Sequence, residues 1–155
     1  PQIELVYSEA APQEIQHRLA KLLQFTVKNP KPLTRTLVEP VPALRNSKSG
    51  RLDAERIADA FGIALSDVAR AVNKSYSTVH KTPDSSALQN ALYPFERIAG
   101  AIKTLTGGAL EPGLKIWLNA PNKAFPKDMP VELIKEGHAS MLADMLEDVL
   151  LGQPG

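Results

Sequence analysis

The stretch Trp117-Leu118-Asn119-Ala120-Pro121-Asn122 holds the only tryptophan of the chain and separates two short segments of helical pattern. Leu114 stands one turn before this tryptophan, and after a loop rich in Lys and Pro a second helix is predicted to begin at Pro130. A tryptophan in this position usually packs inward, so we expect Trp117 in the core rather than in direct contact with a partner. The pattern predicts a small helical module with one aromatic anchor.

A longer helix is predicted before this module. Apolar residues recur every three or four positions over residues 88–105, and Gly107-Gly108 ends the pattern. Pro94 falls inside the run, where its ring removes one helical hydrogen bond, so the helix is expected to kink or restart there. We therefore place a domain boundary at this proline, between residues 51–93 and residues 94–155.

A final helix is predicted after Gly137 and ends at Gly152. Met141 and Met145 fall on its apolar face, where methionines are more often core than interface. The opposite face is acidic and is most simply a solvated surface, although it could meet a basic partner. Its acidic residues are Asp144, Glu147 and Asp148.

The first fifty residues form a separate region. Helical spacing after Pro12 predicts a helix to about Val27, and the prolines between 29 and 41 forbid a regular helix there. Residues 1–50 carry seven Lys/Arg against four Asp/Glu, so a polyanion would meet this region first, although an ordinary solvated surface would look similar. We interpret the region as a helix with a linker or arm that docks on the body or pairs with a second copy.

Two short helices are predicted to meet at Asn73-Lys74, where Asn tolerates the left-handed backbone of a tight turn. Ser66 is expected to cap the first helix and Ser75 the second, because serine side chains accept hydrogen bonds from free N–H groups at helix starts. Ala69, four residues before the turn, and Val79, six after it, would pack the helices together. This spacing resembles the helix-turn-helix of bacterial repressors of the Xre and Cro type.

That resemblance implies that the second helix enters the major groove of DNA. By position, base edges would be contacted by Tyr76, Ser77, His80 and Lys81, with Lys74 and Ser75 near phosphate. The alternative is a helical hairpin with only a structural role. Two features favour it: Pro83 shortens the second helix, and residues 51–85 contain five basic and five acidic side chains instead of a basic stripe. A dimer would strengthen binding by presenting two such helices.

The composition favours an all-α protein and sets limits on function. A chain of 155 residues with 43% hydrophobic and 5% aromatic residues fits one domain or two small helical ones. Without cysteine, disulfides, thiolate metal sites and a cysteine nucleophile are excluded. The sequence shows no apolar run of membrane-spanning length and no signal-peptide pattern, so we expect a soluble, cytoplasmic protein.

No constellation of residues predicts catalysis, a metal or a cofactor. His17, His80 and His138 lie in three different regions and lack the i, i+4 partner of a helical zinc site. Gly107-Gly108 lacks the Lys-Ser or Lys-Thr of a phosphate loop, and adjacent carboxylates such as Glu147 and Asp148 diverge on a helix. We therefore expect a binding protein rather than an enzyme.

Residues 87–152 carry a longer pattern, which reads in order Phe95-Glu96-Arg97-Ile98, Gly107-Gly108, Trp117 to Asn122, Pro130, Glu132-Leu133-Ile134 and Gly137. This order resembles the toxin-binding domain of antitoxins of the Xre, MbcA and ParS type. The resemblance implies that the domain's structural residues are Trp117, Leu118, Pro121, Asn122 and Pro130. The loop over residues 123–129 departs from the family pattern.

The resemblance implies a type II toxin–antitoxin pair whose toxin has a RES domain and degrades NAD. The chain would inhibit that toxin through its C-terminal domain and repress its own operon through the helix-turn-helix, as a homodimer or a larger complex. Toxin contacts would come from Asp144, Glu147, Asp148, Leu151, Gly152, Gln153, Pro154 and Gly155. The alternative is a stand-alone DNA-binding regulator whose C-terminal domain only oligomerises.

Overall fold

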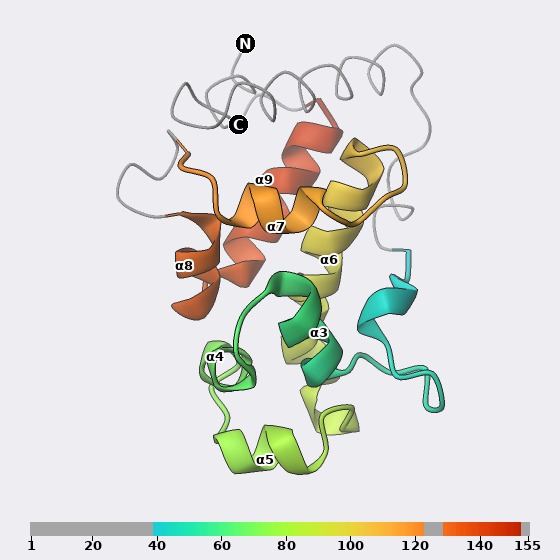
Figure 1. The fold of residues 1–155 in the computed structure, drawn as a ribbon, viewed down its shortest axis with the longest axis vertical. Coiled ribbons are helices and arrows are strands. Elements are labelled where there is room, and N and C mark those ends of the chain that lie inside the picture. The colour runs from blue at the N-terminus through green and yellow to red at the C-terminus, as the bar shows by residue number, and fades with distance from the viewer. Residues whose placement is uncertain (1–38, 123–128, 153–155) are drawn as a thin grey trace.

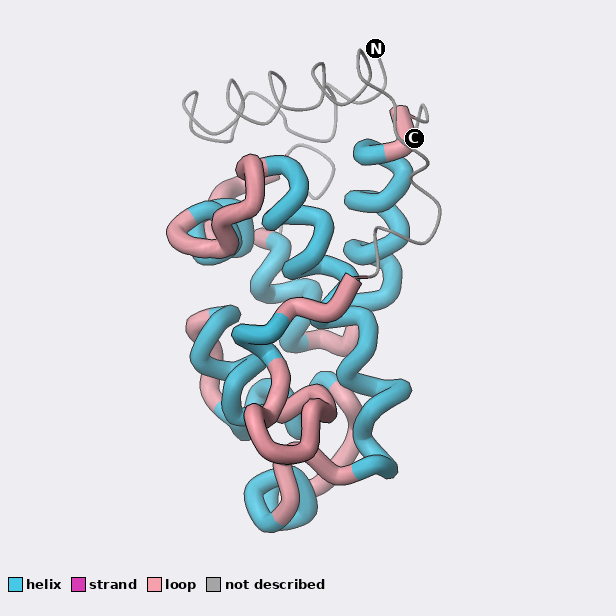
Figure 2. Tube along the Cα trace, turned by 90° about the vertical axis from the view of Figure 1, so that its right-hand side faces the viewer, coloured by secondary structure: helices cyan, strands magenta, loops and turns pink. Residues whose placement is uncertain are grey.

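The computed structural model describes residues 39–122 and 129–152, and these form helices without any strand (Figures 1 and 2). The all-α prediction is thus confirmed for this part of the chain. The helix expected from Pro12 and the tail residues Gln153, Pro154 and Gly155 lie outside it. None of its helices has both the length and the apolar character needed to cross a membrane. The elements are η2 (Pro42–Leu44), α3 (Ala54–Phe61), α4 (Leu65–Ala71), α5 (Tyr76–Lys81), η3 (Ser86–Leu88), α6 (Gln89–Leu105), α7 (Gly113–Leu118), α8 (Pro130–Lys135) and α9 (Ala139–Leu150).

The 17-residue helix α6 is the element that the others share. It packs against η3 near its start and against α7 and α9 further along, and Phe95 meets Phe61 of α3 edge to face, with ring centroids 5.3 Å apart. Of the two expected outcomes at Pro94, a kink or a restart, the restart does not occur, because α6 is one helix with Pro94 inside it. Buried Leu92 and Phe95 on either side of the proline hold the helix by packing, which outweighs one missing hydrogen bond. The expected boundary at Tyr93-Pro94 therefore falls inside one helix.

Local signals explain most helix ends before α6. Asp53 caps α3 by accepting hydrogen bonds from the backbone N–H groups of Glu55 and Arg56, and α3 ends at Gly62 with φ of 68°. The expected cap of α4 by Ser66 is wrong, because α4 begins at Leu65. The Asp67 carboxylate accepts a hydrogen bond from the Ala64 N–H at 3.0 Å and takes over the capping role.

The α4–α5 pair has the predicted geometry at its turn. Asn73 has φ of 59°, in the left-handed region, and the Ser75 hydroxyl accepts a hydrogen bond from the Thr78 N–H at 3.2 Å. Val68, Ala69 and Val79 are buried between the two helices and the body. The predicted turn, cap and packing residues are thus confirmed.

Trp117 lies on α7 and is only 3% exposed, as predicted for a core residue. Pro130 is the first residue of α8, where its missing N–H has no helical partner to lose. Met141 departs from its predicted core position, with 44% of its surface exposed. Met145, the other predicted core methionine, is partly buried against the core, and the buried residues of α9 are Ala139, Leu142, Ala143, Leu146, Val149 and Leu150.

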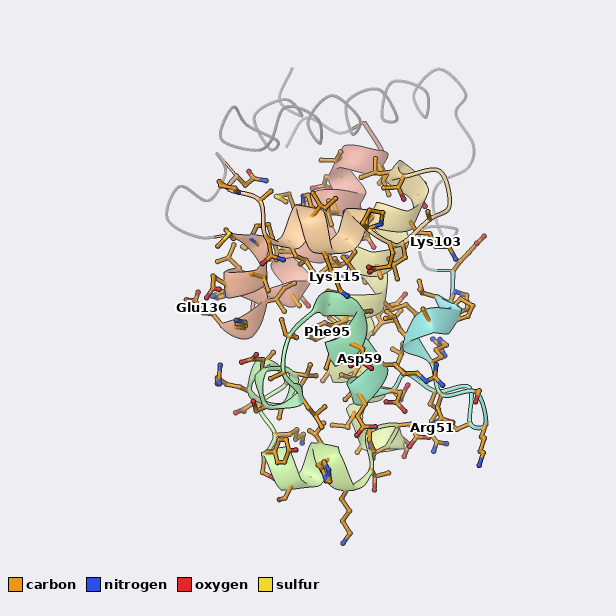
Figure 3. The ribbon with its side chains drawn as sticks, in the orientation of Figure 1. Arg51, Asp59, Phe95, Lys103, Lys115 and Glu136 are labelled. Carbon is orange, nitrogen blue, oxygen red and sulfur yellow. The ribbon has the colours of Figure 1, made fainter. Side chains whose placement is uncertain are left out.

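The two halves of the described chain share one apolar core, because the buried side chains from Val41 to Leu150 form a single cluster. Besides the contacts of α6, α3 packs against α7 and α4 packs against α8. Lys115 of α7 lies over Gly62 at the end of α3 (Figure 3), and Gly137 after α8 approaches the carbonyl oxygen of Ala71. Helices α3 and α4 therefore pack directly against α7 and α8, so the described chain forms one body rather than two domains joined by a linker.

Candidate functional site

Helix α5 contributes one side chain to the core and presents the others to solvent. Val79 is fully buried, whereas the other five residues of the helix are exposed. In Figure 1, α5 lies at the end of the described body remote from the last turn of α9. The residues predicted to contact DNA are all exposed and lie on or just before α5: Lys74, Ser75, Tyr76, Ser77, His80 and Lys81.

The rings of Tyr76 and His80 stack on this surface. They are four residues apart, so both side chains lie on the same helix face, with ring centroids 5.3 Å apart and planes inclined by 24°. Tyr76 is 50% exposed, the highest value among the large exposed apolar side chains of the described residues. Neither ring hydrogen-bonds to another described residue, so the polar edges of the pair remain available.

Ser75, which was predicted to lie near phosphate, stabilises the first turn of α5. Ser75 Oγ lies 2.7 Å from Thr78 Oγ1 and 3.3 Å from Ser77 Oγ, in addition to capping α5. These contacts order the first turn of the helix. The sequence predicted the cap, but it did not predict that the hydroxyl groups would contact one another.

Two acidic residues in the segments before and after α5 pair with arginines. Asp67 pairs with Arg70 at 3.3 Å, and Asp84 faces Arg51 at 3.7 Å while accepting a hydrogen bond from Ser49 Oγ at 2.7 Å. The Ser49 hydrogen bond, with help from Arg51, lowers the pKa of Asp84 below its usual value. Lys74 and Lys81, by contrast, form no ion pair with any described residue. Their charges are therefore not cancelled locally.

A second exposed face runs along α9. Met141, Asp144, Asp148 and Leu151 recur at intervals of three or four residues and are all exposed, with Leu151 at 43%. Gly152 follows with φ of 74°. Of the residues predicted to contact a toxin, Asp148 and Leu151 lie on this face without an ion pair or hydrogen bond from another described side chain.

Asp144 and Glu147 are engaged within the molecule. Arg97 of α6 donates from Nη2 to Asp144 at 2.5 Å and to Glu147 at 2.6 Å, and its Nε donates to Glu147 at 2.8 Å. The hydrogen bond to Glu147 is the main cause that raises the pKa of Arg97 above its usual value. Helical spacing revealed the acidic pair but could not reveal a partner 47 and 50 residues away.

A buried ion pair was also missed. Glu96 of α6 is 1% exposed and accepts hydrogen bonds at 2.8 Å from the Val41 N–H and from Nε and Nη2 of Arg45. The hydrogen bond to Glu96 raises the pKa of Arg45. This pair ties the segment before α3 to α6.

The residues predicted to be structural do not share one environment. Trp117, Leu118, Asn122 and Pro130 are buried, whereas Pro121 is exposed. The indole N–H of Trp117 is buried without a hydrogen-bond acceptor. Over residues 39–122 and 129–152, no three His, Cys, Asp or Glu side chains converge as possible metal ligands.

Comparison of the chain with models of known families, with curated proteins and with solved structures found no match.

Proposed function

We propose that the chain is an antitoxin that binds double-stranded DNA through α5 and inhibits a RES-domain toxin through α9 and the residues after it. Two lines of reasoning support the proposal. One is the resemblance of residues 87–152 to the toxin-binding domain of Xre, MbcA and ParS antitoxins. The other, which carries most weight, is the exposed surface of α5.

In this proposal α4, the turn at Asn73 and α5 are a helix-turn-helix, and α5 is its recognition helix. A recognition helix must leave its side chains free for base edges, and α5 commits only Val79 to the core. Residues 51–85 stay balanced in charge, because Asp67 and Asp84 pair with Arg70 and Arg51 of the same segment, but neither lysine at the ends of α5 is among these pairs. Lys74 keeps its predicted phosphate contact, and Lys81, which the sequence pattern assigned to base edges, is placed at a phosphate in this proposal.

Binding to duplex DNA from the chain's own promoter tests this half of the proposal. The double variant Lys74→Ala/Lys81→Ala should weaken binding, and the slope of log K against log salt should fall by about 2, roughly 1 per phosphate contact. The matched control is Lys103→Ala, at the far end of α6 (Figure 3). Fluorescence anisotropy at several salt concentrations measures both quantities. Equal loss in the control, or unchanged binding by the double variant, would remove α5 as the DNA surface.

The toxin-binding half is supported by the outer face of α9, where the apolar side chains Met141 and Leu151 flank exposed carboxylates. Apolar anchors within a polar surround are typical of protein interfaces. Asp148 is the uncommitted carboxylate of the predicted set, because Arg97 engages Asp144 and Glu147.

Co-expression with a RES-domain toxin, encoded by a gene next to the one for this chain, tests this assignment. The full-length chain should relieve growth arrest, and Asp148→Lys/Leu151→Asp should lose that protection. Asp59→Lys, on the exposed side of α3 (Figure 3), is the charge-reversal control and should still protect. Full protection by the α9 variant would show that α9 is not the inhibitory surface.

One observation favours the second candidate, a stand-alone regulator whose C-terminal part only oligomerises. Arg97 ties two of the three predicted toxin-contact carboxylates to α6, which suits a structural role for α9. A neighbouring gene for a RES-domain protein, together with protection by the full chain, would select the antitoxin. Without such a neighbour, DNA binding alone would select the regulator.

A further inference from the structure

The stacked rings of Tyr76 and His80 have a feature that exposure alone does not explain. An exposed aromatic side chain is usually free to change rotamer, whereas each of these rings restricts the other through a stack at 5.3 Å. The stack lies entirely on α5, and no described residue of another element hydrogen-bonds to either ring. It therefore orders the two rings without burying them.

A fixed ring position matters most for His80, because its imidazole nitrogens can form directional hydrogen bonds. A neutral imidazole carries one N–H donor and one acceptor nitrogen, and its use in recognition depends on where the ring is held. A ring already held in place loses less conformational freedom when it binds. The other polar groups on this face are less suited to directional readout, because the Ser77 hydroxyl contacts Ser75 and Lys81 is a flexible point charge.

We infer that Tyr76 and His80 form one specificity-determining unit, in which Tyr76 positions the imidazole of His80 and the imidazole N–H donates to N7 of a purine in the major groove. This inference rests on the proposed DNA binding. Both purines carry N7 as an acceptor in that groove. The pair would thus read which strand carries the purine at one base pair, without telling G from A.

Selection of bound duplexes from a random pool by the full chain tests the inference. The wild type should prefer one orientation of purine and pyrimidine at one position, by about fivefold, as expected of a single hydrogen bond. His80→Ala should abolish that preference, and Tyr76→Ala should abolish it at the same position. Tyr76→Phe, which keeps the stack, should retain the preference of the wild type.

Two further variants separate positioning from general affinity. Tyr76→Ala/His80→Ala should lose no more discrimination than His80→Ala alone, because the two residues act together. Lys81→Ala should weaken binding to all sequences evenly and leave the preference in place. Far-UV ellipticity confirms that each variant is folded.

Several outcomes would overturn the inference. One is a preference that survives His80→Ala, and another is loss at different positions in the two alanine variants. In both cases DNA binding by α5 would stand. If the wild type selects no duplex at all, the proposed DNA-binding function fails as well, so the two failures are distinguishable.

Discussion

Glu96 shows how a single buried carboxylate can hold two distant segments together. It lies on α6 and accepts three hydrogen bonds from Val41 and Arg45, which precede α3. A buried charge is costly unless it is paired and hydrogen-bonded, so removal of one partner should cost far more than loss of a surface ion pair. The pair therefore determines where the chain enters the described body.

We predict that Arg45→Met lowers the free energy of unfolding by about 3 kcal/mol, because Glu96 would stay buried with only the Val41 N–H as donor. Arg51→Met removes the more exposed pair with Asp84 and should cost much less, because solvent screens that pair. Urea unfolding followed by the fluorescence of Trp117 measures both. Equal costs for the two variants would contradict the structural role of Glu96.

At the scale of the element, the contact between α6 and α9 combines apolar packing with the charged groups around Arg97. Glu147 receives two of the three hydrogen bonds from Arg97 and is 20% exposed, whereas Asp144 receives one and is 69% exposed. Solvent screens the second pair much more than the first. The two carboxylates should therefore differ in what they contribute to stability.

Glu147→Gln is expected to destabilise the protein by about 1–2 kcal/mol, and Asp144→Asn by less than about 0.5 kcal/mol. Asp148→Asn, on the same helix without an ion pair in the described structure, is the control and should leave stability within about 0.5 kcal/mol. Thermal unfolding by circular dichroism ranks the three variants. A larger loss for Asp144→Asn than for Glu147→Gln would refute this ranking.

The elements differ in how far sequence alone could predict them. The turn at Asn73 and the cap at Ser75 were predictable because each depends on one residue and its immediate neighbours. Ser66 does not cap α4 because Asp67 takes the capping role at the start of that helix, and α6 does not restart at Pro94 because tertiary packing outweighs a local preference.

Other parts of the candidate surfaces could not be predicted. The link between Arg97 and α9 joins residues 47 to 50 positions apart, and helical spacing carries no information on such a pair. The Tyr76–His80 stack depends on rotamers that the sequence does not specify. Met141 was misplaced because a helix with several apolar residues permits more than one inward stripe.

At the scale of the whole molecule, the single apolar core argues against independent halves. Phe61 belongs to α3 and packs edge to face on Phe95 of α6. Helix α6 also packs against α7 and α9. A fragment that begins near residue 87 would expose Leu92 and Phe95 to water. Tests of toxin inhibition should therefore use the full chain.

Phe61→Ala should lower the free energy of unfolding by about 3–5 kcal/mol, and the whole described body should unfold at a lower urea concentration. We expect the fluorescence of Trp117, in the other half, and the far-UV ellipticity to move to the same lower midpoint in urea. Exposed Tyr76→Ala should change the midpoint little. A Trp117 transition that stays in place while the ellipticity becomes biphasic would show that the halves unfold separately.

The anchoring of α5 by Val79 alone has a consequence for hydrogen exchange. A six-residue helix with one buried side chain can open without disturbing α6, so its amide protons should exchange by local opening rather than by global unfolding. The amides of α6 should exchange only at the rate set by the whole core. A ligand that binds α5 would then be recorded first as slower exchange at residues 76–81, while the amides of α6 keep their rates.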